Sequence, residues 1–390
     1  MKNITGFFSI YTALVFGLLG TGLAVAESDH IEYEYGGSIL YDVDDFDGVY
    51  NFDKDAEGID KGQGEGDRVS ELRRGQLYLK AAIGKDWSTK LQLGYNEARG
   101  STEVKDAYIR YKGWDFANIT IGQDKEPFGM DLMTALKNSS AIEKSVASRA
   151  FSIGRNLGVN FSAANKGYSW SVGVYEVGEY DSVNVQESGG NLAVTGRFTL
   201  SPINSDRQVL HFGGSFSTRN LESAEFEVES NAEVQTAMDV LDTRNFAADS
   251  IDQYGLESAW IKDRLALTGE AFYQDVKADL STDSAVYSGY YLQGSLFLSD
   301  DSLRYKKGRF STVKPTADSG AWQLVARRSY LDAEDNQDGL EIRNTMLGVN
   351  YYYRKTIKLM LNYTRTQLTG YDVEALDSGD AVSLRAQYRF

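Results

Sequence analysis

The sequence predicts an all-β protein, a transmembrane antiparallel β-barrel of 16 strands. Three observations predict it: an alternating strand that ends the chain, an export signal at the start, and connections whose lengths alternate along the chain. Residues 380–390 place one apolar set on a single face, Val382, Leu384, Ala386, Tyr388 and Phe390. A strand with one apolar and one charged face suits a barrel wall between lipid and water.

The chain begins with the pattern of a secretory signal peptide. Lys2 precedes an uncharged, mostly apolar stretch that runs to Val25, and Ala24-Val25-Ala26 fits a cleavage site. We therefore expect cleavage after Ala26, with residues 1–26 removed and residues 27–390 forming one barrel domain. The alternative, a permanent membrane anchor, lacks a basic stop signal after Val25.

Composition narrows the classes of function. The chain has no cysteine, and a net charge of −16 argues against a nucleic-acid partner. His30 and His211 are its only histidines. The chain therefore has few of the side chains that metal binding and nucleophilic catalysis use, and we expect no enzyme, no metal site and no cofactor.

Period-2 alternation predicts sixteen strands, an even number as a single-chain bacterial barrel requires. They cover residues 31–44, 68–83, 86–97, 101–112, 116–123, 152–163, 168–178, 191–200, 208–220, 250–262, 264–276, 288–299, 320–331, 343–354, 356–367 and 380–390. Pro127, Pro202 and Pro315 are expected between strands, because proline cannot donate to a β-ladder.

The predicted connections alternate in length. The odd ones are mostly long and polar, around residues 45–67, 124–151, 179–190, 221–249, 277–287, 332–342 and 368–379. The even ones are tight, as at 84–85, 113–115, 165–167 and 263, with one long exception at 300–319. Long loops at one end and short turns at the other are typical of outer-membrane barrels.

Acidic residues concentrate in the first long connection. Residues 42–67 hold ten Asp and Glu against Lys54 and Lys61. One interpretation is a calcium site, but the EF-hand spacing fails both here and at 332–341. The other is a solvated outer loop.

Basic residues predominate on the inner face. When the apolar phase of each strand is assigned to lipid, the inner phase carries Lys80, Lys90, Arg110, Arg197, Arg219, Arg327, Lys358, Arg385 and Arg389. The acids predicted on that phase are Asp106, Glu257 and Glu270. The sequence thus predicts a cationic inner wall within an acidic protein.

Two further segments carry cations. Residues 122–149 are too apolar for a free surface loop, so we expect them to fold into the lumen as a constriction with Lys125, Lys137, Lys144 and Arg149. Residues 303–315 contain Arg304, Lys306, Lys307, Arg309 and Lys314, and we expect them to turn inward and meet that constriction from below. The alternative for this second segment is a solvated basic loop that contacts periplasmic polymers.

Several motifs together resemble the phosphate-selective porin O and P family. They are residues 121–128, Arg73-Arg74, residues 84–91, 289–294, 320–327 and 358–363. The resemblance implies a trimeric sixteen-stranded channel whose inward-folded Lys and Arg bind and pass anions, with Lys125 at a matching position. Two positions depart from the family pattern: Asp124 stands where an aromatic is usual, and Arg328 replaces a lipid-facing aromatic.

We therefore expect an outer-membrane porin for small hydrophilic solutes, with anions such as phosphate and polyphosphate favoured at a Lys/Arg constriction. The expected partners are outer-membrane lipid and lipopolysaccharide, small anions, two further copies in a homotrimer, and the barrel-assembly machinery, which would recognise the terminal Phe390. Two alternatives remain open. One is a general or cation-leaning pore governed by the acidic mouth, and the other is a plugged structural or adhesive barrel.

Overall fold

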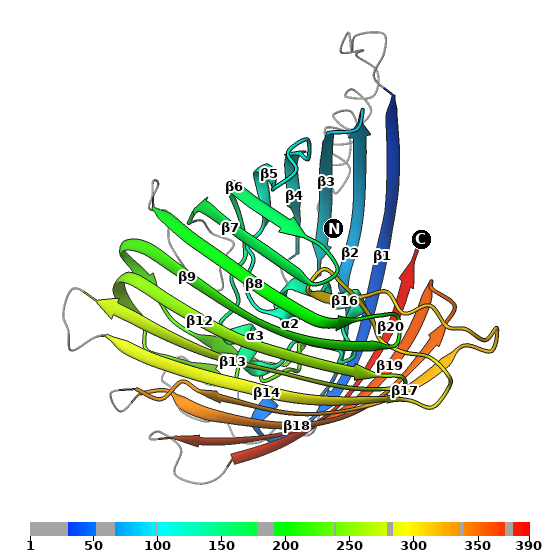
Figure 1. Ribbon diagram of the computed structural model, residues 1–390. Helices are drawn as coiled ribbons and strands as arrows, with labels where there is room; N and C mark the ends of the chain where they lie inside the picture. Colours follow the sequence, from blue (N-terminus) through cyan, green and yellow to red (C-terminus); the bar gives the residue numbers. More distant parts are fainter. Residues whose placement is uncertain are drawn as a thin grey trace, which may run out of the picture.

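Sixteen antiparallel strands close into one barrel (Figure 1). The computed structural model describes residues 30–51, 67–97, 100–177, 191–237, 239–278, 284–335, 338–370 and 377–390. The predicted number and order of strands are confirmed. The expected signal peptide and most of the acidic run at 42–67 lie outside the described residues.

The strands of the barrel are β1 (Ile31–Phe46), β2 (Asp67–Ile83), β3 (Trp87–Asn96), β4 (Ser101–Tyr111), β5 (Asn118–Lys125), β6 (Arg155–Ala164), β7 (Tyr168–Glu176), β8 (Leu192–Asn204), β9 (Gln208–Phe226), β12 (Phe246–Lys262), β13 (Leu265–Ala278), β14 (Ala285–Phe297), β17 (Ala321–Asp332), β18 (Leu340–Tyr353), β19 (Ile357–Gly370) and β20 (Asp377–Arg389). The smaller elements are η1 (Gly48–Asn51), α2 (Met130–Met133), η2 (Leu136–Asn138), α3 (Val146–Ala150), β10 (Glu229–Ser230), β11 (Leu241–Asp242), β15 (Arg304–Lys306) and β16 (Arg309–Ser311).

Side chains alternate across the wall as the sequence predicts. In β20, Leu384 is 50% exposed on the outer face while its neighbour Arg385 is 2% exposed on the inner face. The barrel closes where β1 pairs with β20, and the last residue takes part: Gly37 N–H donates to Phe390 O at 3.1 Å. Among the described residues, no helix has the length and apolarity needed to cross a membrane.

One expectation about proline is wrong. Pro202 lies inside β8, where the pairing with β9 shifts register between Leu200 and Ile203. The interruption leaves Pro202 outside the ladder, so its missing N–H breaks no hydrogen bond.

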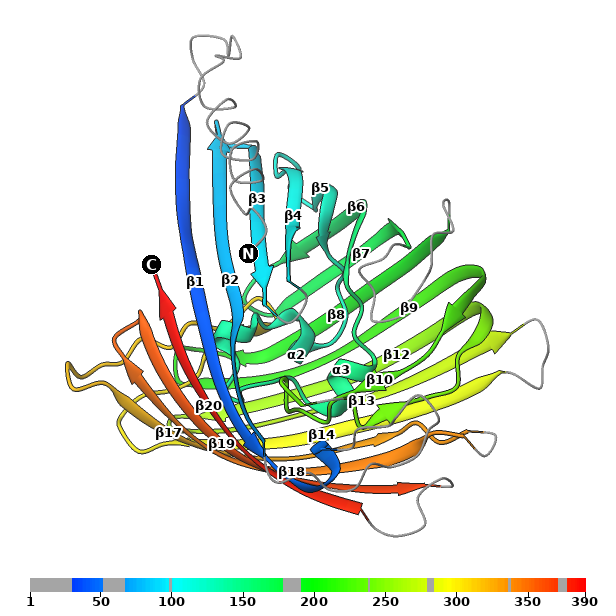
Figure 2. The same ribbon diagram turned by 180° about the vertical axis from the view of Figure 1, so that it is seen from behind.

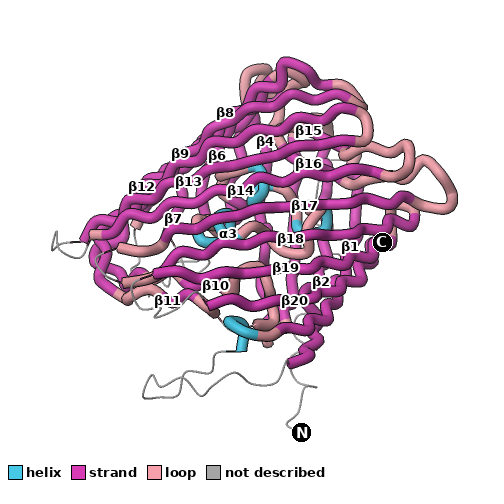
Figure 3. Tube along the Cα trace, turned by 90° about the horizontal axis from the view of Figure 1, so that it is seen from below, coloured by secondary structure: helices cyan, strands magenta, loops and turns pink. Residues whose placement is uncertain are grey.

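Three connections enter the barrel, and they define the two ends of the molecule. The constriction segment, residues 126–154 with α2 and α3, and the 227–245 segment with β10 and β11 enter from the end with long connections, here called the loop end. The basic hairpin β15–β16 enters from the opposite turn end, where β1 begins and β20 ends. Figure 2 shows α2 and α3 enclosed by the strands, and Figure 3 shows α3 among them from below.

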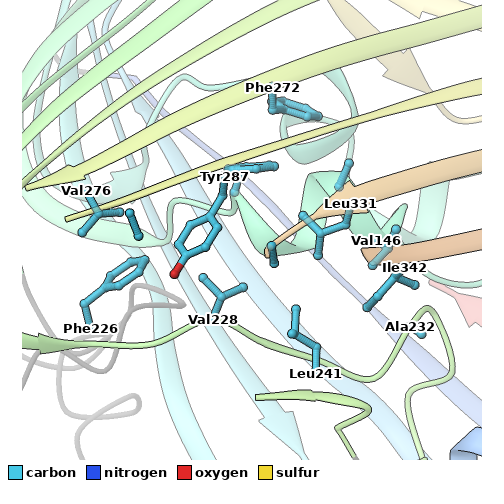
Figure 4. Close-up of a cluster of buried hydrophobic side chains, with 14 of the residues drawn as sticks. Val146, Phe226, Val228, Ala232, Leu241, Phe272, Val276, Tyr287, Leu331 and Ile342 are labelled. Atoms are coloured by element: carbon cyan, nitrogen blue, oxygen red, sulfur yellow. The ribbon is translucent and has the colours of Figure 1, made fainter. Parts of the chain in front are cut away.

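The largest apolar core lies inside the barrel, between the inward segments and one side of the wall (Figure 4). Phe128 and Phe151 of the constriction segment stack on Phe272 of β13, with ring centroids 6.0 and 5.7 Å apart. The 227–245 segment adds Val228 and Leu241. The pattern of connection lengths predicts a long, mostly polar outer connection at residues 221–249. Its buried apolar residues instead hold it inside.

Closure of the barrel gives a test at Gly37. A Cβ at this position would lie 2.4 Å from the Phe390 ring and 2.6 Å from Gln76 O, whereas at Gly214 the nearest atom is 3.7 Å away. Overpacking of this kind costs about 1–3 kcal/mol. We expect Gly37→Ala to lower the midpoint of urea unfolding from vesicles, and Gly214→Ala to leave it close to wild type. Equal midpoints for the two variants would contradict the packing at the β1–β20 seam.

Candidate functional site

A buried carboxylate holds the constriction segment against the barrel seam. Glu143 accepts hydrogen bonds from Arg73 of β2 at 2.9 Å and from Arg385 of β20 at 2.6 Å. Arg385 also donates to Asp42 of β1 at 2.7 Å. Burial opposes ionisation of Glu143, but the guanidinium groups of Arg73 and Arg385 outweigh it and hold the pKa of that carboxyl below its usual value.

Other cations predicted for the inner wall also anchor the inward segments. Arg219 pairs with Glu126 at 3.0 Å, Arg327 pairs with Glu233, and Lys358 donates to Ser139 O. Arg327, Lys358 and Arg385 are at most 4% exposed. These residues do lie on the inner face, but inward segments cover them. Their role in the structure is anchoring.

The predicted set of inner acids was incomplete. The inward segments bring Glu126, Glu143 and Glu233 into the barrel, and Asp42 and Asp44 are buried on the inner face of β1. Strand alternation alone could not place acids that arrive on other segments. Asp42 and Asp44 lie at the end of the predicted strand 31–44, but they also begin the acidic run at 42–67, which favours an exposed loop.

The basic hairpin meets the constriction segment, as predicted. Phe310 N–H donates to Thr134 Oγ1 at 3.2 Å. Two wall residues fix the hairpin from the other side: Arg197 donates to Gly308 O at 2.5 Å, and His211 Nδ1 lies 2.6 Å from Tyr305 Oη. The two segments are thus joined across the lumen.

A cavity of about 1010 Å³ lies between these segments and the wall from β2 to β8. Among the described residues it is lined by fifteen cations, Arg73, Arg74, Lys80, Lys90, Lys105, Arg110, Lys125, Lys137, Lys144, Arg149, Arg155, Arg197, Lys306, Lys307 and Arg309. The acids in its lining are Glu103, Asp106, Asp124 and Glu143. The strands of the barrel wall from β9 to β20, unlike the hairpin β15–β16, contribute none of its lining residues, so the open space is eccentric.

Most of the predicted constriction residues meet at this cavity. Lys125, Lys137, Lys144, Arg149, Lys306, Lys307 and Arg309 line it. Two do not: Arg304 lies 3.8 Å from exposed Asp206, and Lys314 is exposed outside the lining. Of the predicted wall residues, Lys80, Lys90, Arg110 and Arg197 face the cavity.

Carboxylates neutralise only part of this lining. Asp106 pairs with both Lys90 and Arg155, and Asp124 pairs with Arg110 at 3.2 Å. Within the part of the chain that the structure describes, six lining cations have no carboxylate within 4.0 Å, namely Arg74, Lys125, Lys137, Lys306, Lys307 and Arg309. Lys125 instead donates to Leu132 O at 2.6 Å.

Four lining cations are not predicted by strand alternation, namely Arg73, Arg74, Lys105 and Arg155. Two β-bulges account for three of these residues. The β1–β2 register shifts between Leu40 and Asp42, which turns Arg73 and Arg74 to the same side, and a shift opposite Gln92 makes Lys105 an extra residue. Adjacent charged residues within a strand were the available signal, because they break strict alternation.

A possible metal-binding group lies apart from the cavity. The carboxylate oxygens of Glu227, Glu229 and Asp242 lie within 4.8 Å of one another, and two of the three residues are exposed. Exposed carboxylates also gather without a metal, so we assign no ion to them.

Comparison with known proteins identifies relatives of the whole chain. The family model described as phosphate-selective porin O and P matches residues 35–390. Porin O of Pseudomonas aeruginosa is 24% identical over 95% of this chain and 91% of its own length. The anion-selective porin from Comamonas acidovorans has a TM-score of 0.58 at 12% identity, covering 93% of this chain and 100% of its own. The outer membrane channel DcaP of Acinetobacter baumannii has a TM-score of 0.60 at 12% identity, covering 92% and 97%.

The anchoring role of Glu143 can be tested by Glu143→Gln. The substitution leaves Arg73 and Arg385 with one fewer buried partner, and breaking a buried ion pair typically costs about 3–5 kcal/mol. Glu34→Gln is the matched control, because its pair with Lys80 is exposed and worth about 0–1 kcal/mol. We expect a clearly lower urea midpoint for Glu143→Gln alone. Similar small losses in both variants would show that Glu143 is not an anchor.

Proposed function

The chain belongs to the phosphate-selective porin O and P family, and from that premise we propose that small anions, phosphate and polyphosphate foremost, diffuse passively through its cationic cavity. Membership makes the chain an outer-membrane porin, and the proteins of this family are channels. The observation that carries the proposal is the group of six cavity cations without a carboxylate partner among the described residues.

Position rather than net charge should decide selectivity. Exposed loop acids are screened within about 8 Å at physiological ionic strength, whereas charges in a narrow, partly dry site are screened much less. A net charge of −16 is therefore compatible with an anion-preferring channel.

The eccentric cavity supports a narrow route. The apolar core and the covered ion pairs occupy the side of β9 to β20, so a solute would pass along the wall from β2 to β8. A homotrimer is part of the proposal. It is supported by the solved trimer form of Vibrio cholerae OmpT, whose TM-score to this chain is 0.57.

The hairpin cations give a direct test of this route. One unit charge 4 Å from an ion is worth about 1 kcal/mol even in bulk water. We therefore expect neutralising Lys306, Lys307 and Arg309 together with glutamine to lower the anion-to-cation permeability ratio about fivefold or more. Arg304→Gln is the matched control, because Arg304 does not line the cavity. The measurement is the reversal potential of single channels in a salt gradient, where Lys125→Ala should also weaken anion preference.

The outcomes distinguish the other candidate functions. At about 0.15 M salt or higher, loop charges are largely screened. A wild-type channel that is still cation-selective at this salt concentration would show that the acids of the mouth outweigh the cations of the cavity, and would favour the pore governed by its acidic mouth. Absence of conductance from folded protein would favour the plugged barrel. Loss of selectivity in Arg304→Gln equal to that of the triple variant would contradict the proposed route.

The lowered pKa of Lys137 predicts that anion preference depends on pH. Burial, with the nearby charges of Arg389, Lys90 and Lys80, lowers the pKa of its amine to about 8. The positive charge is present below that pH and is lost as pH rises through it. Anion preference should therefore weaken between about pH 7 and 9, while Lys137→Arg, which keeps its charge, should hold its preference at pH 9. Identical pH profiles for the two proteins would rule out Lys137 as the titrating group.

A further inference from the structure

Three arginines lie on the outer face of the barrel near its loop end. Arg328 of β17, Arg343 of β18 and Arg365 of β19 belong to the outward-facing phase of their strands. Arg328 is paired across the sheet with Thr345, and Thr345 is paired with Arg365. The cluster is unusual because this phase of the barrel is otherwise largely apolar or aromatic and faces lipid.

Two of the three arginines have acidic partners. Arg343 pairs with Glu341, which also accepts from Tyr330 Oη at 2.9 Å and from Thr369 Oγ1 at 3.1 Å. Arg365 pairs with Asp380 at 3.2 Å, and Asp380 accepts from Tyr363 Oη at 2.5 Å. Both carboxylates are therefore already engaged.

Arg328 has no carboxylate within 4.0 Å among the described residues. Its Nη1 donates to Thr345 Oγ1, and the rest of the exposed guanidinium has no protein partner in the described chain. Asp332 is four residues farther along the strand, about 13 Å at 3.3 Å per residue. The bond to Thr345 holds the guanidinium against the sheet but leaves its charge uncompensated.

The surroundings fix the depth of Arg328. On the loop-end side, the Tyr290 and Tyr330 rings pack with centroids 5.4 Å apart, as in an interfacial aromatic girdle. On the turn-end side the outer face is apolar, with Leu347 and Leu324 exposed, and Leu292 is paired directly with Arg328. Arg328 thus lies at the upper edge of the apolar band, where acyl chains meet the headgroups of the outer leaflet.

We propose that Arg328 is the centre of a binding site for the phosphate of a phosphorylated glycolipid in the outer leaflet. Guanidinium binds phosphate through paired charge-assisted hydrogen bonds, and a phosphate at this height supplies the charge that the protein does not. The adjacent Leu292 and Leu347 offer an apolar surface to acyl chains, which free phosphate would not use. The site is on the outer wall, so it goes beyond conduction of solutes.

The test compares Arg328→Leu with Lys262→Leu. Lys262 is an exposed outward residue at the opposite, turn end of the barrel, which makes it a matched control. Each protein is folded into phosphatidylcholine vesicles, alone or with bis-phosphorylated lipid A, and the urea unfolding midpoint is measured. A dephosphorylated lipid A and inorganic phosphate serve as the two ligand controls.

In phosphatidylcholine alone, Arg328→Leu should be at least as stable as wild type, because an uncompensated charge on a lipid-facing surface is a cost. Lipid A should raise the midpoint of wild type and of Lys262→Leu but not that of Arg328→Leu, whose affinity for lipid A should fall about tenfold or more, as expected for a lost charge-assisted contact. Dephosphorylated lipid A and inorganic phosphate should have little effect on wild type.

Four results would overturn the proposal. Arg328→Leu could respond to lipid A as wild type does, or it could be less stable than wild type in phosphatidylcholine alone, which would make the bond to Thr345 a structural one. Inorganic phosphate or the dephosphorylated lipid could stabilise wild type as much as lipid A does. Arg328→Leu could also dissociate the oligomer on a native gel, which would show that this face contacts a second copy of the chain.

Discussion

The internal arrangement of this barrel depends on the ion pairs of the Glu143 carboxylate. Glu143 forms ion pairs with Arg73 of β2 and with Arg385 of β20, and Arg385 also pairs with Asp42 of β1. One residue of the constriction segment is therefore bonded to the seam where the barrel closes. The apolar core around Phe272 favours burial of the segment but is not directional, whereas these ion pairs fix where the segment lies.

The same arrangement divides the inner cations into two groups. Where an inward segment covers the wall, it brings an acid or a carbonyl for the cation beneath, as Glu126 does for Arg219 and Ser139 O does for Lys358. Where no segment covers the wall, the cations face the cavity and several lack a carboxylate partner in the described chain. The charge of the cavity is therefore set by the inner cations that the inward segments do not cover. A count of all charged residues on the inner face would misstate this charge.

The sequence predicted the barrel well because alternation is a local signal, repeated in every strand and tied to one buried face. Alternation distinguishes the inner from the outer face of β20, but it does not show whether an inward segment covers a residue on the inner face. Arg385 and Lys80 have the same phase, yet one is covered by Glu143 and the other faces the cavity. The constriction segment was predictable from its apolar residues. The 227–245 segment was missed because its buried residues are scattered among polar ones.

Opposed anchoring of two segments gives the cavity a defined shape. The constriction segment is bonded to the seam through Glu143, and the hairpin is bonded to the wall through Arg197 and Tyr305. Their direct contact, Phe310 N–H to Thr134 Oγ1, joins two structures that enter from opposite ends. Lys306, Lys307 and Arg309 are thereby presented by a short hairpin that is fixed at its turn and along both of its strands. Like charges held in this way cannot separate to relieve their repulsion, so the proposed preference for an anion between them rests on the rigidity of the barrel as well as on its charge.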